Sequence, residues 1–129
     1  MDGKKSLVLT SDAPRANTRQ RPRALAIRCS GGDLDLLFDA GEVLEQSSPD
    51  RVEIRVRYDT ASARTVRGNR STSYHAIFFD DPRPHVRSLL KTKTALVEFT
   101  PFTRGPIVAE FDVAGLKDYF DLLKRHCRF

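Results

Sequence analysis

The segment RVEIRVRY, residues 51–58, alternates charged and apolar side chains at every position. A period of two predicts a β-strand, because successive side chains of a strand point to opposite faces of the sheet. One face would carry Val52, Ile54, Val56 and Tyr58, and the other Arg51, Glu53, Arg55 and Arg57. The charged face must meet water, so the segment predicts an antiparallel sheet with one solvated face.

Strand-like segments recur along the chain and are separated by turn residues. The further strands expected are 7–9, 24–29, 34–38, 74–79, 94–100 and 107–113. Ser30-Gly31-Gly32-Asp33 separates the second and third of these segments, which is typical of a hairpin. Residues 63–67 show only a weak strand pattern, and Gly68-Asn69 resembles a turn.

Two helices are expected among these strands. Asp81 as N-cap and Pro82 at the first helical position predict a short helix that ends near Leu90. Apolar residues at helical spacing after Gly115 predict an amphipathic helix that ends the chain. Its apolar face would contain Leu116, Tyr119, Phe120, Leu123 and Cys127.

The order of these elements predicts an α+β fold, mainly an antiparallel β-sheet or sandwich with a short internal helix and a C-terminal amphipathic helix. No parallel βαβ pattern is present. The 129 residues suit one domain over 1–129, with a basic, linker-like segment at 10–23. No apolar run is long enough to span a bilayer as a helix, so we expect no membrane span.

The formal net charge of +5 belongs to the N-terminal segment, because basic and acidic residues balance over residues 31–129. Two clusters of arginines are candidates for binding an anion such as a phosphate. They are Arg15, Arg19, Arg21 and Arg23 in the first cluster, and Arg67 and Arg70 in the second. Solvated surface loops are the simpler interpretation, since no aromatic residues interleave the first cluster to stack on bases.

Residues with catalytic chemistry form no recognisable motif, so we expect a non-enzymatic protein with no cofactor and no metal. A small hydrolase would need tertiary structure to bring His75 or His85 to a distant carboxylate. The segment TPFTRGP, residues 100–106, is typical of a hairpin corner because its prolines restrict the backbone and its glycine permits a turn. Phe102 and Arg104 are its candidate protein-contact residues, although a Phe packed against the core is the simpler interpretation.

Cys29 and Cys127 lack the C-x-x-C spacing of a redox or zinc motif. A bond between them would join an early strand to the end of the last helix and would require an oxidising compartment. Two buried, unpaired thiols in a cytosolic protein are an equal alternative at this point.

Several motifs occur together in a recognisable order. They are ALAIRCSGGDLDLLFDAG, VRYD, STSYHAIFF, ALVEFTPFTRGPIVAEFDVAGL and a final helix that closes on HC. This order resembles the VasI/TagO family of type VI secretion accessory proteins and related small exported bacterial proteins, over roughly residues 6–128. The chain departs from the family pattern in having no tryptophan and in placing Ser73 where an aspartate is expected.

The resemblance implies an exported, periplasmic or secreted protein from which a signal peptide was removed, with Cys29 bonded to Cys127. It implies an accessory function in which the protein binds an envelope or secretion-machine protein, and it supplies no catalytic residue. The oligomeric state stays unknown. The alternative function is binding of nucleic acid or another anionic surface through the basic N-terminal segment.

Overall fold

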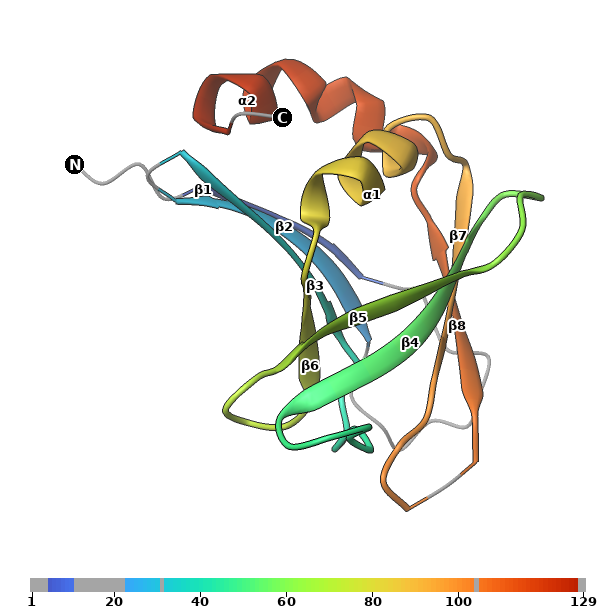
Figure 1. Cartoon of the computed structure of the whole chain (residues 1–129). Helices are drawn as coiled ribbons and strands as arrows, with labels where there is room; N and C mark the ends of the chain where they lie inside the picture. The colour runs from blue at the N-terminus through green and yellow to red at the C-terminus, as the bar shows by residue number, and fades with distance from the viewer. Residues whose placement is uncertain (1–4, 11–22, 31, 104, 128–129) are drawn as a thin grey trace.

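A computed structural model of the chain describes residues 5–10, 23–30, 32–103 and 105–127, which form one eight-stranded sheet with short helices at one end (Figure 1). The strands are β1 (Lys5–Thr10), β2 (Ala24–Ser30), β3 (Asp33–Asp39), β4 (Arg51–Tyr58), β5 (Arg64–Arg70), β6 (Ala76–Phe79), β7 (Thr94–Phe99) and β8 (Ile107–Asp112). The helices are α1 (Pro82–Leu89), the 3-10 helix η1 (Ala114–Tyr119) and α2 (Phe120–His126). Of the predicted linker-like segment 10–23, residues 11–22 lie outside the described residues.

The strand order is β1-β2-β3-β6-β5-β4-β7-β8, and all neighbouring strands pair antiparallel. This arrangement confirms the predicted α+β, mainly antiparallel class. The sheet curls so that β3 faces β7 and β8 across the core, where the Phe38 ring centroid lies 5.1 Å from that of Phe99 and 6.0 Å from that of Phe111. The core is therefore enclosed by one curled sheet instead of the two sheets of a sandwich.

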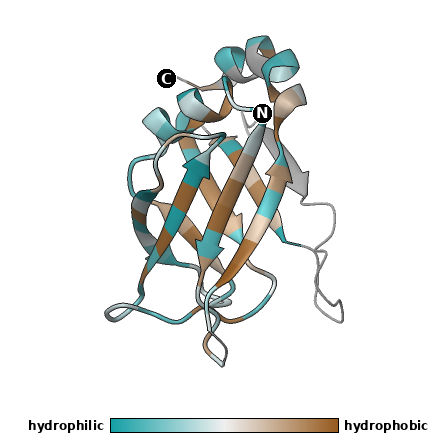
Figure 2. Ribbon diagram, turned by 90° about the vertical axis from the view of Figure 1, so that its right-hand side faces the viewer, coloured by the Kyte–Doolittle hydropathy of each residue, from teal (hydrophilic) through white to brown (hydrophobic). Residues whose placement is uncertain are grey.

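The alternation in β4 confirms the sequence interpretation of this strand. Its even-numbered residues are buried and its charged, odd-numbered residues face outward. The same banding of hydrophilic and hydrophobic residues is visible along neighbouring strands (Figure 2). The curled sheet thus has an apolar inner face and a charged outer face, as expected for an antiparallel sheet with one wet side.

Strand β5 corrects the prediction of a turn at Gly68-Asn69. Both residues lie inside the strand, where Gly68 pairs with Val52 on one side and Phe79 on the other. A Cβ atom at position 68 would come within 2.0 Å of the carbonyl oxygen of Phe78. The glycine is required by this close backbone approach and not by a turn.

The remaining boundaries differ in smaller ways. Strand β6 begins at Ala76 and not at Tyr74, whose φ of 67° is left-handed. Helix α1 begins at Pro82 as predicted, but the Asp81 side chain makes no capping hydrogen bond. The C-terminal helix starts as a 3-10 turn, and Tyr119 is exposed although the amphipathic pattern placed it on the apolar face.

Candidate functional site

The disulfide joins Cys29 of β2 to Cys127, which follows α2, with a Cα–Cα distance of 5.4 Å. Both cysteines are buried, and an isolated bridge between Gly32 and Cys127 extends the contact along the backbone. The bond confirms the pairing implied by the family resemblance. It fixes the C-terminal helix to the end of the sheet opposite the connection between β7 and β8 (Figure 1).

Three apolar side chains reach the surface at that opposite, loop-bearing end, and we call them the loop-end patch: Val43, Tyr74 and Phe102. Backbone bonds hold their segments together, since the amide of Phe102 donates to Val43 (2.9 Å) and the amide of Leu44 donates to Tyr74 (2.9 Å). Phe102 is 68% exposed, so it does not pack against the core. Its predicted companion Arg104 lies outside the described residues.

The guanidinium of Arg70 contacts residues of the loops that carry the loop-end patch. It lies 4.3 Å from the ring centroid of Tyr74 and donates to the carbonyl oxygen of Leu44 at 3.3 Å. It also forms an ion pair with Asp50 at 3.6 Å. Arg70 therefore holds two of the loops that carry the patch, although its sequence context suggested an anion-binding residue.

The other predicted anion-binding residues are dispersed. Arg67 pairs with Glu53 across β5 and β4 at 3.4 Å. Arg23 is only 2% exposed, where it pairs with Glu42 at 3.4 Å and lies 5.2 Å from the ring centroid of Phe99. It is a core residue in this fold and not part of an exposed cluster. Arg15, Arg19 and Arg21 lie outside the described residues.

A partly buried polar contact joins α1 to the sheet. The Tyr58 hydroxyl lies 2.7 Å from Nδ1 of His85, and the Phe79 ring packs edge-on against the imidazole at 5.2 Å. Burial raises the pKa of Tyr58. The pKa of His85 is lowered, chiefly by burial and then by the charge of Arg64, while the charge of Asp81 acts to raise it. The imidazole of His85 thus forms its hydrogen bond with a phenol, where a hydrolase would need a carboxylate.

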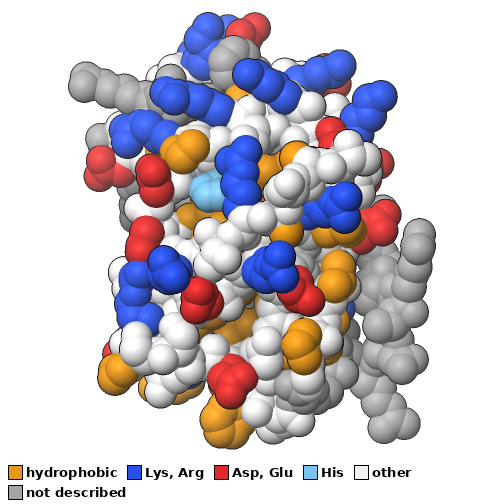
Figure 3. Space-filling view, turned by 45° about the vertical axis from the view of Figure 1, so that its right-hand side comes forward, with side chains coloured by type: hydrophobic (Ala, Val, Ile, Leu, Met, Phe, Trp, Pro, Cys, Tyr) orange, Lys and Arg blue, Asp and Glu red, His pale blue; other side chains and the backbone are white. Residues whose placement is uncertain are grey.

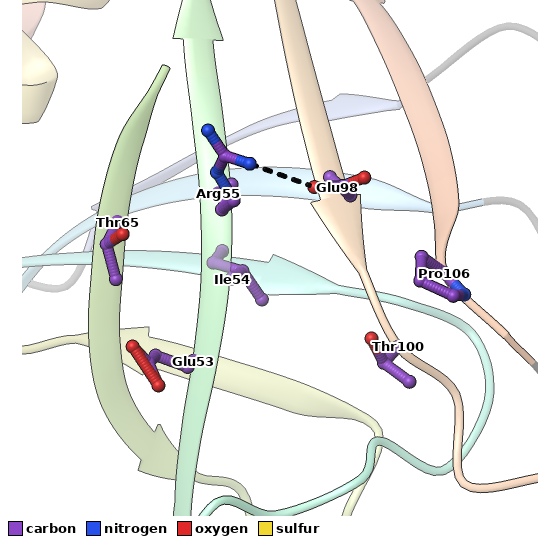
Figure 4. A pocket seen from close by; sticks show the side chains of 7 residues that line it. All are labelled: Glu53, Ile54, Arg55, Thr65, Glu98, Thr100 and Pro106. Atoms are coloured by element: carbon purple, nitrogen blue, oxygen red, sulfur yellow. Dashed lines mark ion pairs between the residues drawn. The ribbon is translucent and has the colours of Figure 1, made fainter.

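The outer face of the sheet is covered by interleaved basic and acidic side chains, with apolar side chains in small separate groups (Figure 3). A hollow of about 230 Å³ lies on this face where β4 and β7 diverge (Figure 4). It is lined by Glu53, Ile54, Arg55, Thr65, Glu98, Thr100 and Pro106. Arg55 pairs with Glu98 across it at 3.9 Å. Sequence reasoning missed this hollow, since its residues look like an ordinary charged strand face.

The described residues contain neither a metal-binding cluster nor a membrane-spanning helix. No group of three or more His, Cys, Asp or Glu side chains there is arranged to hold a metal ion. In the same ranges, no helix has both the length and the apolar character needed to cross a membrane.

The fold and the site together define a disulfide-tied α+β domain whose described surface features are an apolar loop-end patch and a charged hollow. Comparisons with protein-family models, with curated proteins and with solved structures each give no match for this chain.

Proposed function

We propose that this protein is a non-enzymatic, exported accessory protein that binds another protein through the loop-end patch. The observation that carries this proposal is the exposure of Phe102 beside Val43 and Tyr74 on loops held by backbone bonds and by Arg70. Exposed aromatic side chains on preorganised loops supply much contact area at small entropic cost, and aromatic residues are enriched among binding hot spots.

The disulfide supports export, because such bonds persist in oxidising compartments and are rare in the cytosol. The resemblance of the sequence motifs to the VasI/TagO family suggests where the partner resides. On this proposal the partner is a protein of the bacterial envelope or of a secretion machine, such as the type VI system.

Binding of nucleic acid through the arginines is the weaker candidate. Each described arginine of the predicted set has an acidic partner, namely Glu42 for Arg23, Glu53 for Arg67 and Asp50 for Arg70. Their charges are therefore at least partly balanced within the fold. That function would have to depend on residues 11–22.

Photo-crosslinking in the native cell tests the proposal. A photoreactive phenylalanine analogue at position 102 should give one discrete adduct with an envelope protein. The same analogue at Tyr119, an exposed aromatic residue at the helical end, serves as the matched control. Equal adducts at both positions, or an adduct with nucleic acid alone, would contradict the proposal.

A further inference from the structure

The hydrogen-bond ladder between β4 and β7 stops before β4 does. Its last pair is Arg55 with Glu98. In the same register the amide of Asp59 donates to Thr94 at 2.8 Å, so every second residue from Asp59 back to Arg55 directs its backbone polar groups toward β7. By this alternation the backbone groups of Glu53 also point toward β7.

The partner that the register assigns to Glu53 is Thr100, but Thr100 bonds elsewhere. Its carbonyl oxygen accepts from the amide of Glu45 at 3.0 Å, and the next residue forms a bridge with Leu44. Within the described residues, no backbone hydrogen bond joins Glu53 to β7. The sheet therefore forks here, and one strand position of β4 keeps an open donor and acceptor.

The hollow described above lies in this fork, and Glu98 is its candidate contact for a cation, because the other lining carboxylate, Glu53, already pairs with Arg67 at 3.4 Å. Two carboxylates, Glu53 and Glu98, and one guanidinium, Arg55, line it. The Arg55–Glu98 contact is long, at 3.9 Å, and joins well-exposed side chains, so it holds Glu98 weakly. Glu98 therefore has free capacity to accept a hydrogen bond from a cationic group.

The size of the hollow also limits what it can hold. At about 230 Å³ it is smaller than the pockets of about 300–1,000 Å³ that enclose whole small-molecule ligands. It suits one side chain and the peptide group that carries it. An extended peptide supplies both, because its amide groups can pair with an open strand position as they do in β-augmentation.

We propose that the β4–β7 fork binds an extended basic segment of a protein partner, with a Lys or Arg side chain on Glu98 and the adjoining peptide group on the backbone of Glu53. This site is distinct from the loop-end patch and does not depend on it. The partner would contribute one positive charge to Glu98 and one peptide group to the unpaired backbone of Glu53.

Titration of the ¹⁵N-labelled full chain with the capped peptide acetyl-Thr-Lys-Val-Thr-amide, followed by NMR, tests this site. We expect saturable shifts that are largest at the backbone amides of Glu53 and Glu98. The same peptide with Glu in place of Lys should bind at least tenfold more weakly. A lysine peptide N-methylated at the lysine amide should bind more weakly as well, because it loses the backbone donor.

A pair of variants distinguishes the fork from general attraction to acidic residues. Glu98→Gln should weaken binding of the lysine peptide up to about fivefold, as expected for an exposed ion pair. Glu110→Gln makes the same charge change on β8 outside the hollow and should leave binding unchanged. Unchanged thermal unfolding of both variants would show that they fold normally.

Three outcomes would overturn the proposal: equal binding of the Glu and Lys peptides, an equal effect of both variants, or shifts confined to the loop-end patch. If the N-methylated and unmethylated lysine peptides bound equally well, the proposed hydrogen bonding between the peptide and the backbone of Glu53 would be overturned. Failure of the crosslinking at position 102 would leave this result untouched, so the two proposals are tested separately.

Discussion

The hydroxyl of Tyr58 on β4 lies 2.7 Å from Nδ1 of His85 on α1, so a hydrogen bond between these two side chains joins the helix to the inner face of the sheet. Burial raises the pKa of Tyr58, so the phenol stays protonated, and the tautomer of the neutral imidazole decides which of the two groups donates. Protonation of His85 would place a charge in a partly buried site near Arg64, beside Phe79.

We therefore predict that stability falls on mild acidification. The pKa of His85 in the folded protein is lowered from about 6.5, chiefly by burial, so the unfolded chain binds more protons between the two pKa values. The contribution of His85 is complete above pH 6.5 and is lost as the pH falls through its folded pKa.

Urea unfolding at pH 7.5 and pH 5.5 measures this effect. The midpoint should drop at the lower pH, and His85→Gln, which cannot titrate, should reduce the drop. An identical drop in the variant would assign the pH dependence to other groups.

Gly68→Ala should destabilise the protein strongly. The added Cβ would lie 2.0 Å from the carbonyl oxygen of Phe78 in the neighbouring strand, so β5 and β6 would have to separate. We expect a loss of about 1–3 kcal/mol or more in the free energy of unfolding, measured by chemical denaturation. Gly115→Ala is the matched control and should be neutral, because nothing lies within 4 Å of its added Cβ.

The Cys29–Cys127 bond should contribute substantially to stability, because it closes a loop with a sequence separation of 98. The double variant Cys29→Ser, Cys127→Ser should lose about 2–5 kcal/mol of unfolding free energy. Intact mass after alkylation gives a direct check on the native protein. Without reductant we expect no alkylation, and two freely alkylated thiols would refute both the bond and the argument for export.

Truncation of two phenylalanines should change the stability by very different amounts. Phe38 is buried and packs against Phe99 and Phe111, so Phe38→Ala should cost about 3–5 kcal/mol of unfolding free energy. Phe102→Ala should change stability by less than about 0.5 kcal/mol, because its side chain is exposed. If the loop-end patch binds a partner, Phe102→Ala should nevertheless lose that binding. A pull-down of the partner identified by crosslinking would measure the loss.

Much of the fold follows from local patterns. The alternation of β4 and the proline at the start of α1 each predicted an element whose position the structure confirms. Gly68 was misassigned because a glycine in a turn and a glycine beneath a neighbouring backbone look the same in sequence. Only the pairing of β5 with β6 separates the two cases.

The candidate sites were far less accessible to sequence reasoning. Phe102 and Arg70 were singled out, but the exposure of the first and the supporting role of the second depend on how separate loops meet. The fork was missed altogether, because the open backbone of Glu53 exists only where Thr100 bonds to Glu45 instead.

By itself, the sequence determined the class of the fold, most strand positions and the two faces of β4, because side-chain periodicity is a property of the local chain. Tertiary structure alone decided the strand order, the approach of Cys29 and Cys127 to within bonding distance and the divergence of β4 from β7. These features depend on which distant segment supplies each backbone or sulfur partner, and that choice is made only when the sheet curls around its core.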